Sequence, residues 1–300
     1  MLAVTILGNN SAIPAFDRHP TAQILQTEDQ GYLIDCGEGT QTQMSVYKIR
    51  RVKLNHIFIS HLHGDHYFGL IGLLVSMGLL GRKQDLFLYA PPELKTIIDL
   101  QLRVAAASLP YIIHFHGLGA EGIILDDKRL TVSCFHTRHR IPCWGFVFTE
   151  KRKARHIDGI KLGGYDISAD QYGRLQDGHD IQLHDGTILL NNDYTLPGSP
   201  GKQYAYCADT LYDESIVEKV MNSDTIYHEA TYLHALHEKA TARYHATSKQ
   251  AAMIALKANA GKLLLGHFSS MYETLDEFVT EACEVFPNTE LALEGICYKI

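Results

Sequence analysis

Short apolar runs, each bounded by Gly, Asn, Pro or Asp, recur along the first half of the chain and predict β-strands. They lie at 3–7, 22–26, 31–34, 56–59, 86–89, 130–135 and 145–149. Helices are expected from about Gly69, and from the Pro91-Pro92 pair through about Leu102. The first half therefore interleaves strands with helices.

The second half shows the same alternation. Strands are predicted at 187–190, 203–207, 225–228 and 262–265, and helices near 213–221, 248–258 and 275–285. Interleaving in both halves predicts an α/β fold with two sheets sandwiched between helices. For 300 residues the expected organisation is one domain over 1–300 that carries an insertion.

The expected insertion lies at about 151–186, where the chain becomes polar, rich in glycine and poor in apolar periodicity. It opens with a basic run, Lys-Arg-Lys-Ala-Arg. A protruding, mobile arm and a solvated loop with incidental charge both fit this composition.

Composition narrows the class of protein. Hydrophobic residues make up 46% and charged residues 20%, which is typical of a soluble globular chain. The net charge of −7 argues against a surface built entirely to hold nucleic acid. The six cysteines form no CxxC pair, as expected of reduced thiols in the cytoplasm. No secretory signal is evident, and the longest apolar stretch, 68–81, is too short to cross a membrane.

The densest chemical signal is the six-residue motif His61-Leu62-His63-Gly64-Asp65-His66, which follows a predicted strand. Imidazole and carboxylate are ligands that suit zinc. On an extended strand end His61 and His63 point the same way, whereas Asp65 and His66 follow the Gly64 turn. The motif therefore divides into two pairs, each able to begin a metal site.

Further ligands are available where later strands end. His139, Asp209 and His267 each follow such a strand, and a carboxylate such as Asp209 can bridge two ions. Taken singly, each has an ordinary alternative, because most histidines are surface or core residues and an aspartate after a strand commonly forms a turn. His136 lies near His139 and could replace it.

The motif resembles the HxHxDH signature of the metallo-β-lactamase superfamily. Other blocks, in family order along almost the whole chain, resemble the short form of the ribonuclease Z family, the tRNA 3′ processing endonucleases. They are Leu7–Pro14, Arg18–Ala22, Leu33–Gln41, Phe68–Leu74, His139–Pro142, Ala208–Thr210, His228–Thr231, His245–Thr247 and His267–Ser269. The His-Glu-Ala-Thr and His-x-Thr blocks carry the assignment to ribonuclease Z.

The resemblance implies a metallo-β-lactamase fold, an αββα sandwich of two mixed sheets flanked by helices, with an inserted flexible arm at about 151–186 that binds tRNA. It implies two Zn²⁺ per chain, one on His61, His63, His139 and Asp209, the other on Asp65, His66, Asp209 and His267. The implied activity is removal of 3′ trailers from tRNA precursors by a cytoplasmic homodimer.

Two catalytic residues are expected beside the metals. Asp65 would orient and deprotonate the attacking water, and the resemblance places His245 as proton donor to the departing 3′ oxygen. The alternative role for His245 is to cap the following helix. Glu229 is the candidate partner that orients His245, with a buried structural ion pair as the alternative. Asp35 and Glu38 are expected to support the site or form loops.

The chain departs from the family pattern in three places. The arm lacks the usual Gly-Pro-rich motif, Ala246 stands where Ser is usual, and Met271 stands where Arg is common. Two rival functions follow: a di-zinc phosphodiesterase acting on small phosphodiesters or other RNA, and a noncatalytic RNA-binding protein. The complete ligand set argues against the second.

Overall fold

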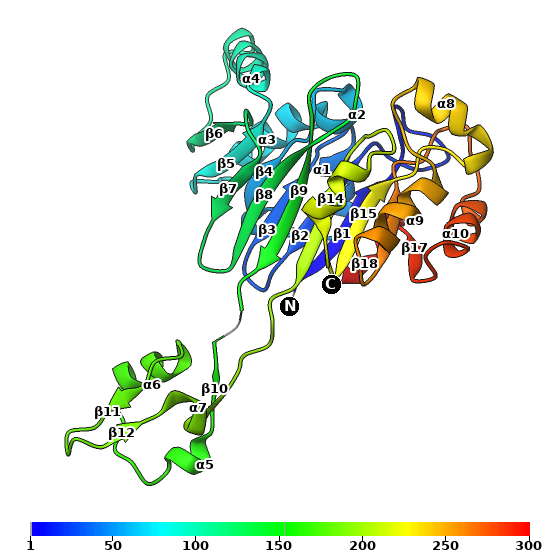
Figure 1. The fold of residues 1–300 in the computed structure, drawn as a ribbon. Coiled ribbons are helices and arrows are strands. Elements are labelled where there is room, and N and C mark those ends of the chain that lie inside the picture. The colour runs from blue at the N-terminus through cyan, green and yellow to red at the C-terminus, as the bar shows by residue number, and fades with distance from the viewer. Residues whose placement is uncertain (1, 153) are drawn as a thin grey trace.

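The computed structural model describes residues 2–152 and 154–300, and its main body is a sandwich of two sheets with helices on both outer faces (Figure 1). The first sheet has seven strands in the order β18-β1-β2-β3-β4-β5-β6. Their bounds are β1 Ala3–Gly8, β2 Ala22–Gln26, β3 Gly31–Ile34, β4 Leu54–Phe58, β5 Leu86–Ala90, β6 Ile113–Gly117 and β18 Cys297–Lys299. The pairing of β1 with β18 brings the two ends of the chain together.

The second sheet also has seven strands, in the order β17-β16-β15-β14-β9-β8-β7. Their bounds are β7 Gly122–Asp126, β8 Leu130–Thr137, β9 Cys143–Glu150, β14 Gln203–Cys207, β15 Thr225–Glu229, β16 Leu263–Gly266 and β17 Thr289–Leu291. Both sheets mix parallel and antiparallel pairs. The predicted α/β sandwich is confirmed.

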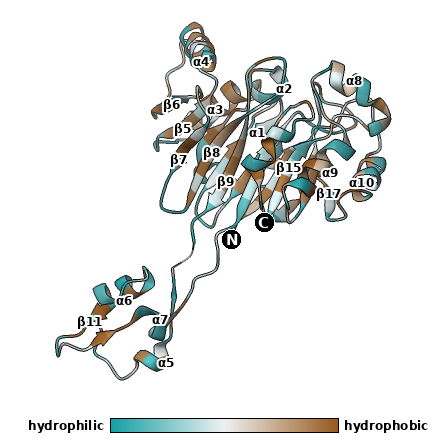
Figure 2. Cartoon of the chain, viewed as in Figure 1, coloured by the Kyte–Doolittle hydropathy of each residue, from teal (hydrophilic) through white to brown (hydrophobic). Residues whose placement is uncertain are grey.

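Hydrophobic residues concentrate on the strands (Figure 2), and a buried core that includes Phe58, Phe146 and Tyr206 lies between the sheets. A second core packs helices against the outer face of the first sheet, through residues of α1 (Thr40–Val46), α3 (Leu70–Leu79) and α4 (Glu93–Val104). A third does the same for the second sheet, with α9 (Ser248–Lys257) and α10 (Asp276–Cys283). Each sheet is therefore covered on both faces.

The strand directions bring the loops that carry the candidate functional residues to one end of the sandwich. β3, β4 and β5 run parallel in the first sheet, and β14, β15 and β16 run parallel in the second. Parallel strands end at the same edge of a sheet, so the loops that follow β4, β14, β15 and β16 gather there. Those loops carry the motif of 61–66, Asp209, Thr231 and His267.

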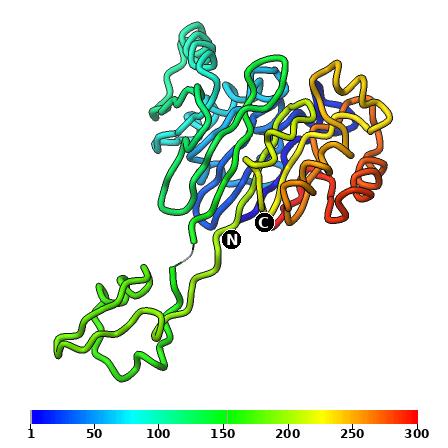
Figure 3. The backbone as a smooth tube through the Cα atoms, viewed as in Figure 1, coloured from blue at the N-terminus to red at the C-terminus, as the bar shows by residue number. Residues whose placement is uncertain are grey.

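The segment between β9 and β14 leaves the body as an arm and returns beside its point of departure (Figure 3). At its root the Glu150 amide donates to the Lys202 carbonyl oxygen at 2.7 Å. The arm has its own small core of Leu162, Leu175, Ile181 and Leu189. Its elements are β10 His156–Ile157, α5 Gly159–Leu162, α6 Ala169–Gln176, β11 Ile181–Gln182, β12 Ile188–Leu189, α7 Asn191–Tyr194 and β13 Thr195–Leu196. The excursion thus continues past Gly186, where the polar composition ends.

One predicted helix is wrong. In place of a helix near 213–221, two 3₁₀ turns, η2 Glu214–Ile216 and η3 Glu218–Val220, follow an Asp213 side-chain cap. Met221 returns to an extended ψ of 134°, so the segment ends before a regular helix can propagate. Short elements without a clear period were missed: α2 Gly64–Tyr67, α8 His237–Ala242, the 3₁₀ turns η1 Arg51–Lys53 and η4 His234–Leu236, α1, β6, β7, β17 and β18.

Across the described ranges, no helix combines the length and apolar character needed to cross a membrane.

Candidate active site

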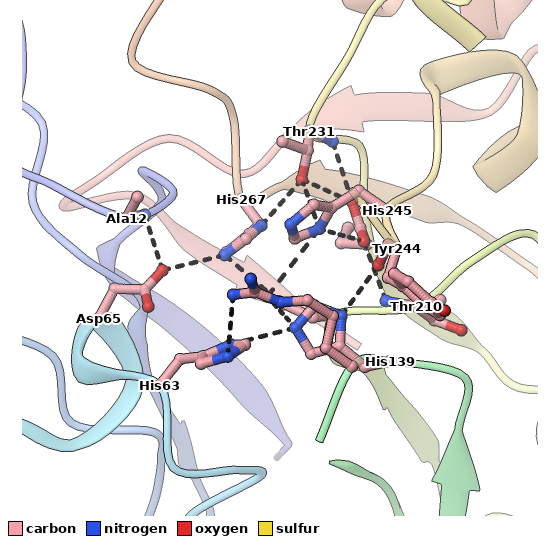
Figure 4. Close-up of polar contacts among 12 residues, drawn as sticks. Ala12, His63, Asp65, His139, Thr210, Thr231, Tyr244, His245 and His267 are labelled. Carbon is pink, nitrogen blue, oxygen red and sulfur yellow. Dashed lines mark hydrogen bonds and ion pairs between the residues drawn. The ribbon is translucent and has the colours of Figure 1, made fainter. Parts of the chain in front are cut away.

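The candidate site lies where the strand-end loops of both sheets meet, and the close-up shows their side chains pointing toward one another (Figure 4). The motif of 61–66 enters after β4 and continues into the short helix α2, so Asp65 and His66 are helical rather than part of a simple turn. The predicted residues brought together are His61, His63, Asp65, His66, His139, Asp209, Glu229, His245 and His267.

One group of possible metal ligands consists of His61, His63, His139 and Asp209. His63 Nδ1 lies 3.0 Å from His61 Nε2 and 3.1 Å from His139 Nε2. The same two Nε2 atoms lie 3.7 and 3.8 Å from Asp209 Oδ2. These four atoms surround a common point.

A second group contains Asp65, His66 and His267, and Asp209 extends it. The Nε2 atoms of His66 and His267 are 3.3 Å apart. Asp209 Oδ1 lies 3.4 Å from the first and 3.2 Å from the second. Asp65 Oδ2 lies 3.6 and 3.4 Å from the same pair. Asp209 therefore presents one oxygen to each group.

The spacing fits metal ions. Bonds of about 2.0–2.1 Å in a tetrahedral shell separate neighbouring ligand atoms by roughly 3.3 Å. Asp209 is 2% exposed, and its Oδ1 atom forms no hydrogen bond within the described residues. A buried carboxylate oxygen without a donor is costly unless a cation compensates it.

The proton positions around the histidines also favour metal binding. His139 Nδ1 donates to the Tyr244 carbonyl oxygen at 2.9 Å, which leaves the Nε2 lone pair free. His66 Nδ1 lies 2.8 Å from Asp35 Oδ2, and a carboxylate can only accept. In the neutral form of each ring Nε2 is therefore the nitrogen that faces the shared centre with its lone pair, as metal ligation requires.

Two hydroxyl groups fix the remaining rings in the same way. Ser60 Oγ donates to Asp35 at 2.8 Å, so at 3.0 Å it can accept a hydrogen bond from His61 Nδ1–H. Thr231 Oγ1 donates to Glu229 at 2.6 Å and lies 3.0 Å from His267 Nδ1. Sequence reasoning missed Ser60 and the Thr231 hydroxyl, because a lone Ser or Thr beside a strand carries no signal of its own.

Asp35 contacts several of the groups that orient these histidine rings. Its carboxylate accepts from the Ser60 amide at 2.7 Å and from the Tyr206 hydroxyl at 2.6 Å, besides its contacts with Ser60 Oγ and His66. Asp35 is fully buried and adopts a positive φ of 56°. The supporting role expected of Asp35 agrees with this position.

Burial and neighbouring charges set different protonation states in the two groups. Burial lowers the pKa of His61 well below its ordinary value and that of His63 to about 4, so both are neutral and ready to bind a cation. Burial also acts to lower the pKa of His66, but Asp209 and Asp65 raise it well above the usual value. Metal binding at the second group therefore has to displace a proton.

His245 lies beside the centre, on the connection between α8 and α9. Its Nδ1 atom lies 2.9 Å from Glu229 Oε1 and 3.9 Å from Asp209 Oδ2. Burial alone would lower the pKa of His245, but the Glu229 carboxylate raises it to about 9. His245 with Asp209 and His267 also forms a third set of possible ligands. It does not cap the next helix, because Thr247 supplies that cap.

An open cleft of about 450 Å³ borders the centre. Asp65, Asp209 and His245 line its polar side together with Arg140, whose Nη2 atom lies 3.2 Å from His63 Nε2. Ile13, Pro14 and Phe68 supply an apolar wall, and Glu38 also lines the cleft. The cleft can hold a ligand that carries both a phosphate and an apolar ring.

Two other histidines, one of them the alternative to His139, lie away from the centre. His136, the alternative to His139, is exposed on β8 and its ring contacts Trp144 at a centroid distance of 3.8 Å. His114 pairs with Asp85 at 2.8 Å. The structure therefore places His139, and not His136, at the centre.

The fold and this site define the class of protein. The short form of human tRNase Z superposes with a TM-score of 0.74 at 26% identity, covering 100% of this chain and 99% of that one. The metallo-β-lactamase fold protein YhfI from Bacillus subtilis gives 0.70 at 21% identity, with 100% of both chains covered. The chain is a protein of the metallo-β-lactamase fold.

Sequence relatives identify the family. A ribonuclease Z from Bacteroides fragilis (strain YCH46) is 39% identical over 98% of this chain and 98% of its own length. One from Cytophaga hutchinsonii is 41% identical over 98% of this chain and 95% of its own length. The chain belongs to the ribonuclease Z family. A family model described as anti-Pycsar protein Apyc1 matches residues 2–151, so the first half also belongs to that family.

Proposed function

We propose that this chain is a zinc-dependent endoribonuclease that removes 3′ trailers from tRNA precursors. Identities of 39% and 41% to proteins named ribonuclease Z, each over 98% of this chain, support the activity. The observation that carries the chemistry is the convergence of seven imidazole and carboxylate side chains on two adjacent points that share Asp209.

We assign one zinc to His61, His63, His139 and Asp209, and the other to Asp65, His66, His267 and Asp209. When bound, the pair of ions would lower the pKa of a water molecule and offset the charge that develops on the phosphate. The fixed tautomers of His61, His66, His139 and His267 support this assignment, because each keeps Nε2 available.

The protein side chains move the protons. The carboxylate of Asp65, oriented by the Ala12 amide, which donates to Oδ2 at 2.7 Å, accepts a proton from the water that attacks phosphorus. The bond between phosphorus and the 3′ oxygen breaks, and His245 gives its proton to that oxygen. Glu229 orients His245 and keeps it protonated near neutral pH. The products are a tRNA with a 3′ hydroxyl and a trailer with a 5′ phosphate.

The arm of 151–201 is proposed to hold the tRNA away from the cleavage site. Its folded part, 154–201, has seven aspartates against three lysines and arginines, a net charge of −4. Neutralising the phosphates of the tRNA therefore cannot be the main way in which the folded part of the arm contributes to binding. The exposed rings of Tyr165 and Tyr172 can stack or donate hydrogen bonds instead.

We propose that the enzyme works as a homodimer. The arm leaves at the Glu150 end of β9, whereas the site lies at the Cys143 end, so the eight residues of this strand separate them by roughly 25 Å. An arm directed away from its own site is suited to serve the site of a partner copy (Figure 1). Beside α1 and α3, four exposed apolar side chains offer a surface for self-association: Val46, Val52, Leu79 and Leu80.

A cytoplasmic location is proposed as well, since all six cysteines are free thiols in the structure, as is usual in a reducing compartment.

The deciding experiment is cleavage-site mapping on a 3′-extended pre-tRNA with zinc-loaded protein. A single cut at the 3′ end of the acceptor stem supports the proposal. Intact pre-tRNA, together with hydrolysis of a small chromogenic phosphodiester, would overturn it in favour of a small-substrate phosphodiesterase. Omitting the encoded CCA end from half of the substrates shows how a mature end is treated.

A further inference from the structure

Phe68 is an aromatic residue whose exposure is not explained by packing. Phe68 is 64% exposed, yet it lies two residues after the motif of 61–66 and lines the cleft with Asp65 and His63. Within the described residues it joins no buried hydrophobic cluster, whereas neighbouring Tyr67 packs against the core under α3. We interpret the exposed Phe68 ring as a surface that binds a ligand.

The Phe68 ring is held in place although it is exposed. A Cβ atom added to Gly64 would lie 2.3 Å from the ring carbon Cε2, so the ring rests directly on the backbone of the motif. The Tyr67 ring meets it edge-on, with centroids 5.0 Å apart. The Phe68 amide also donates to the Gly64 carbonyl oxygen at 3.0 Å. One face of the ring is thus supported beside the proposed catalytic residues.

A second apolar side chain shares the cleft. Ile13 is 56% exposed and belongs to the loop whose Ala12 amide donates to Asp65. Ala12 has a positive φ of 65°, and the Ile13 carbonyl oxygen accepts from Asn10 Nδ2 at 2.6 Å, which fixes this loop at the rim. Apolar surface and the proposed zinc centre therefore line the same cleft.

We propose that Phe68, with Ile13 beside it, is a stacking platform for the nucleobase that flanks the scissile phosphate. This inference rests on the proposed function and adds how the RNA is positioned. Any base offers a flat face to an aromatic ring, so the contact tolerates sequence and suits an enzyme that must cut many different tRNA precursors. Stacking holds the phosphodiester over the centre without a base-specific hydrogen bond.

The first test compares two substrates in Phe68→Ala, Phe68→Leu and Phe68→Trp. We expect the Ala and Leu variants to lose about ten-fold in kcat/KM on pre-tRNA, the factor that one stacked base of roughly 1.4 kcal/mol supplies. Phe68→Trp should retain activity. Zinc content should stay unchanged in all three, and hydrolysis of bis(p-nitrophenyl) phosphate, whose rings can also reach Phe68, should fall by less than cleavage of pre-tRNA. Ile123→Ala, at a comparably exposed side chain on the edge strand β7, is the matched control and should cleave pre-tRNA normally.

A second test reads stacking directly. 2-Aminopurine is placed on either side of the scissile phosphate, and its fluorescence is measured on binding in an Asp65→Asn background that slows cutting. Quenching that depends on Phe68 supports the platform, and the quenched position identifies the stacked nucleotide. Unchanged pre-tRNA cleavage in Phe68→Ala, equal loss on both substrates, or a changed sedimentation coefficient would overturn it. If the unmodified protein leaves pre-tRNA uncut, the proposed function itself has failed.

Discussion

His245 pairs with the buried Glu229, with Nδ1 and Oε1 separated by 2.9 Å, beside the carboxylate that joins both ligand groups. Glu229 is fully buried, and its second oxygen accepts from the Thr231 hydroxyl, which in turn contacts His267. The pair therefore connects the proposed proton donor to a proposed ligand. The position of Glu229 supports the orienting role more than a purely structural ion pair.

The first prediction concerns the pH dependence of kcat. Glu229 raises the pKa of His245 to about 9, so a required proton on His245 is present below that pH and lost above it. In Glu229→Gln the pKa of His245 falls, because the main opposing influence, burial, then dominates. We expect kcat on pre-tRNA to drop about 10- to 100-fold at pH 8 and the alkaline limb of its profile to move to lower pH.

Zinc content and the melting temperature of Glu229→Gln serve as controls for this experiment. The single glutamine oxygen can still accept from the Thr210 amide, and the glutamine NH2 can donate to the Thr231 hydroxyl oxygen in place of accepting from it, so the fold should persist. An unshifted alkaline limb would show that Glu229 has only a structural role.

The second prediction separates the two metal positions. His63 belongs only to the first ligand group, whereas His267 belongs with Asp65 and His66. We expect His63→Ala and His267→Ala each to lose about one zinc per chain by elemental analysis, and both to lose activity. His136→Ala, at the exposed ring on Trp144, is the matched control and should keep both ions. Full zinc content in either variant would contradict the assignment.

Metal removal should also weaken the fold. An ion that binds only the folded state at 100 times its dissociation constant adds about 2.7 kcal/mol to the free energy of unfolding. Chelation should therefore lower the melting temperature by several degrees, and added zinc should restore it. The His136→Ala control should respond as the unmodified protein does.

The metal motif could be found from sequence because its residues are adjacent along the chain. His139, Asp209 and His267 could be proposed because each follows an apolar strand, and parallel strands end at one edge. The tautomers could not be predicted. They depend on Ser60, Thr231 and the Tyr244 carbonyl oxygen, which the fold brings to the rings from separate loops.

The helices and strands could also be predicted only where their residues form a clear pattern along the chain. Strands with regular apolar spacing were located to within a residue or two at 22–26, 31–34 and 203–207. The short edge strands β7 and β17 were not, since half-exposed strands of five and three residues lack a clear alternation. The folded core of the arm was also missed, because Leu162, Leu175, Ile181 and Leu189 are too widely spaced to show a period.

The third prediction concerns acid stability. His56 is 6% exposed and stacks on the Tyr32 and Phe87 rings, at centroid distances of 5.3 and 5.1 Å. Burial lowers its pKa to about 4, although Asp127 acts to raise it. The unfolded chain therefore takes up this proton at higher pH than the folded one, and stability is lost as pH falls from about 6.5 to 4.

The difference between a pKa of about 6.5 in the unfolded chain and about 4 in the folded one lowers the free energy of unfolding by about 3 kcal/mol across that window. In His56→Phe the ring stack is kept and the titration is removed, so urea unfolding should depend less on pH between 6.5 and 4. Equal pH slopes in both proteins would contradict the prediction.

The fourth prediction tests how the arm holds RNA. Because Glu150 pairs with Lys202 across the root, residues 151–201 can be replaced by an Asn-Gly turn without disturbing β9 and β14. The shortened protein should hydrolyse bis(p-nitrophenyl) phosphate normally and bind pre-tRNA at least ten-fold more weakly. Equal loss on both substrates would mean that the arm supports the fold of the body instead.

Charge variants then distinguish the contribution of the folded part of the arm to RNA binding from that of its root. Arg152 is exposed at the root, next to Lys151, whereas Arg174 lies on α6 in the acidic folded part. A cation that contacts a phosphate contributes about one to the slope of log affinity against log salt. We expect Arg152→Gln to reduce that slope by about one and Arg174→Gln to leave it unchanged, because a surface with net charge −4 cannot rely on counterion release. A reduced slope in Arg174→Gln would show that the arm grips the RNA backbone through charge after all.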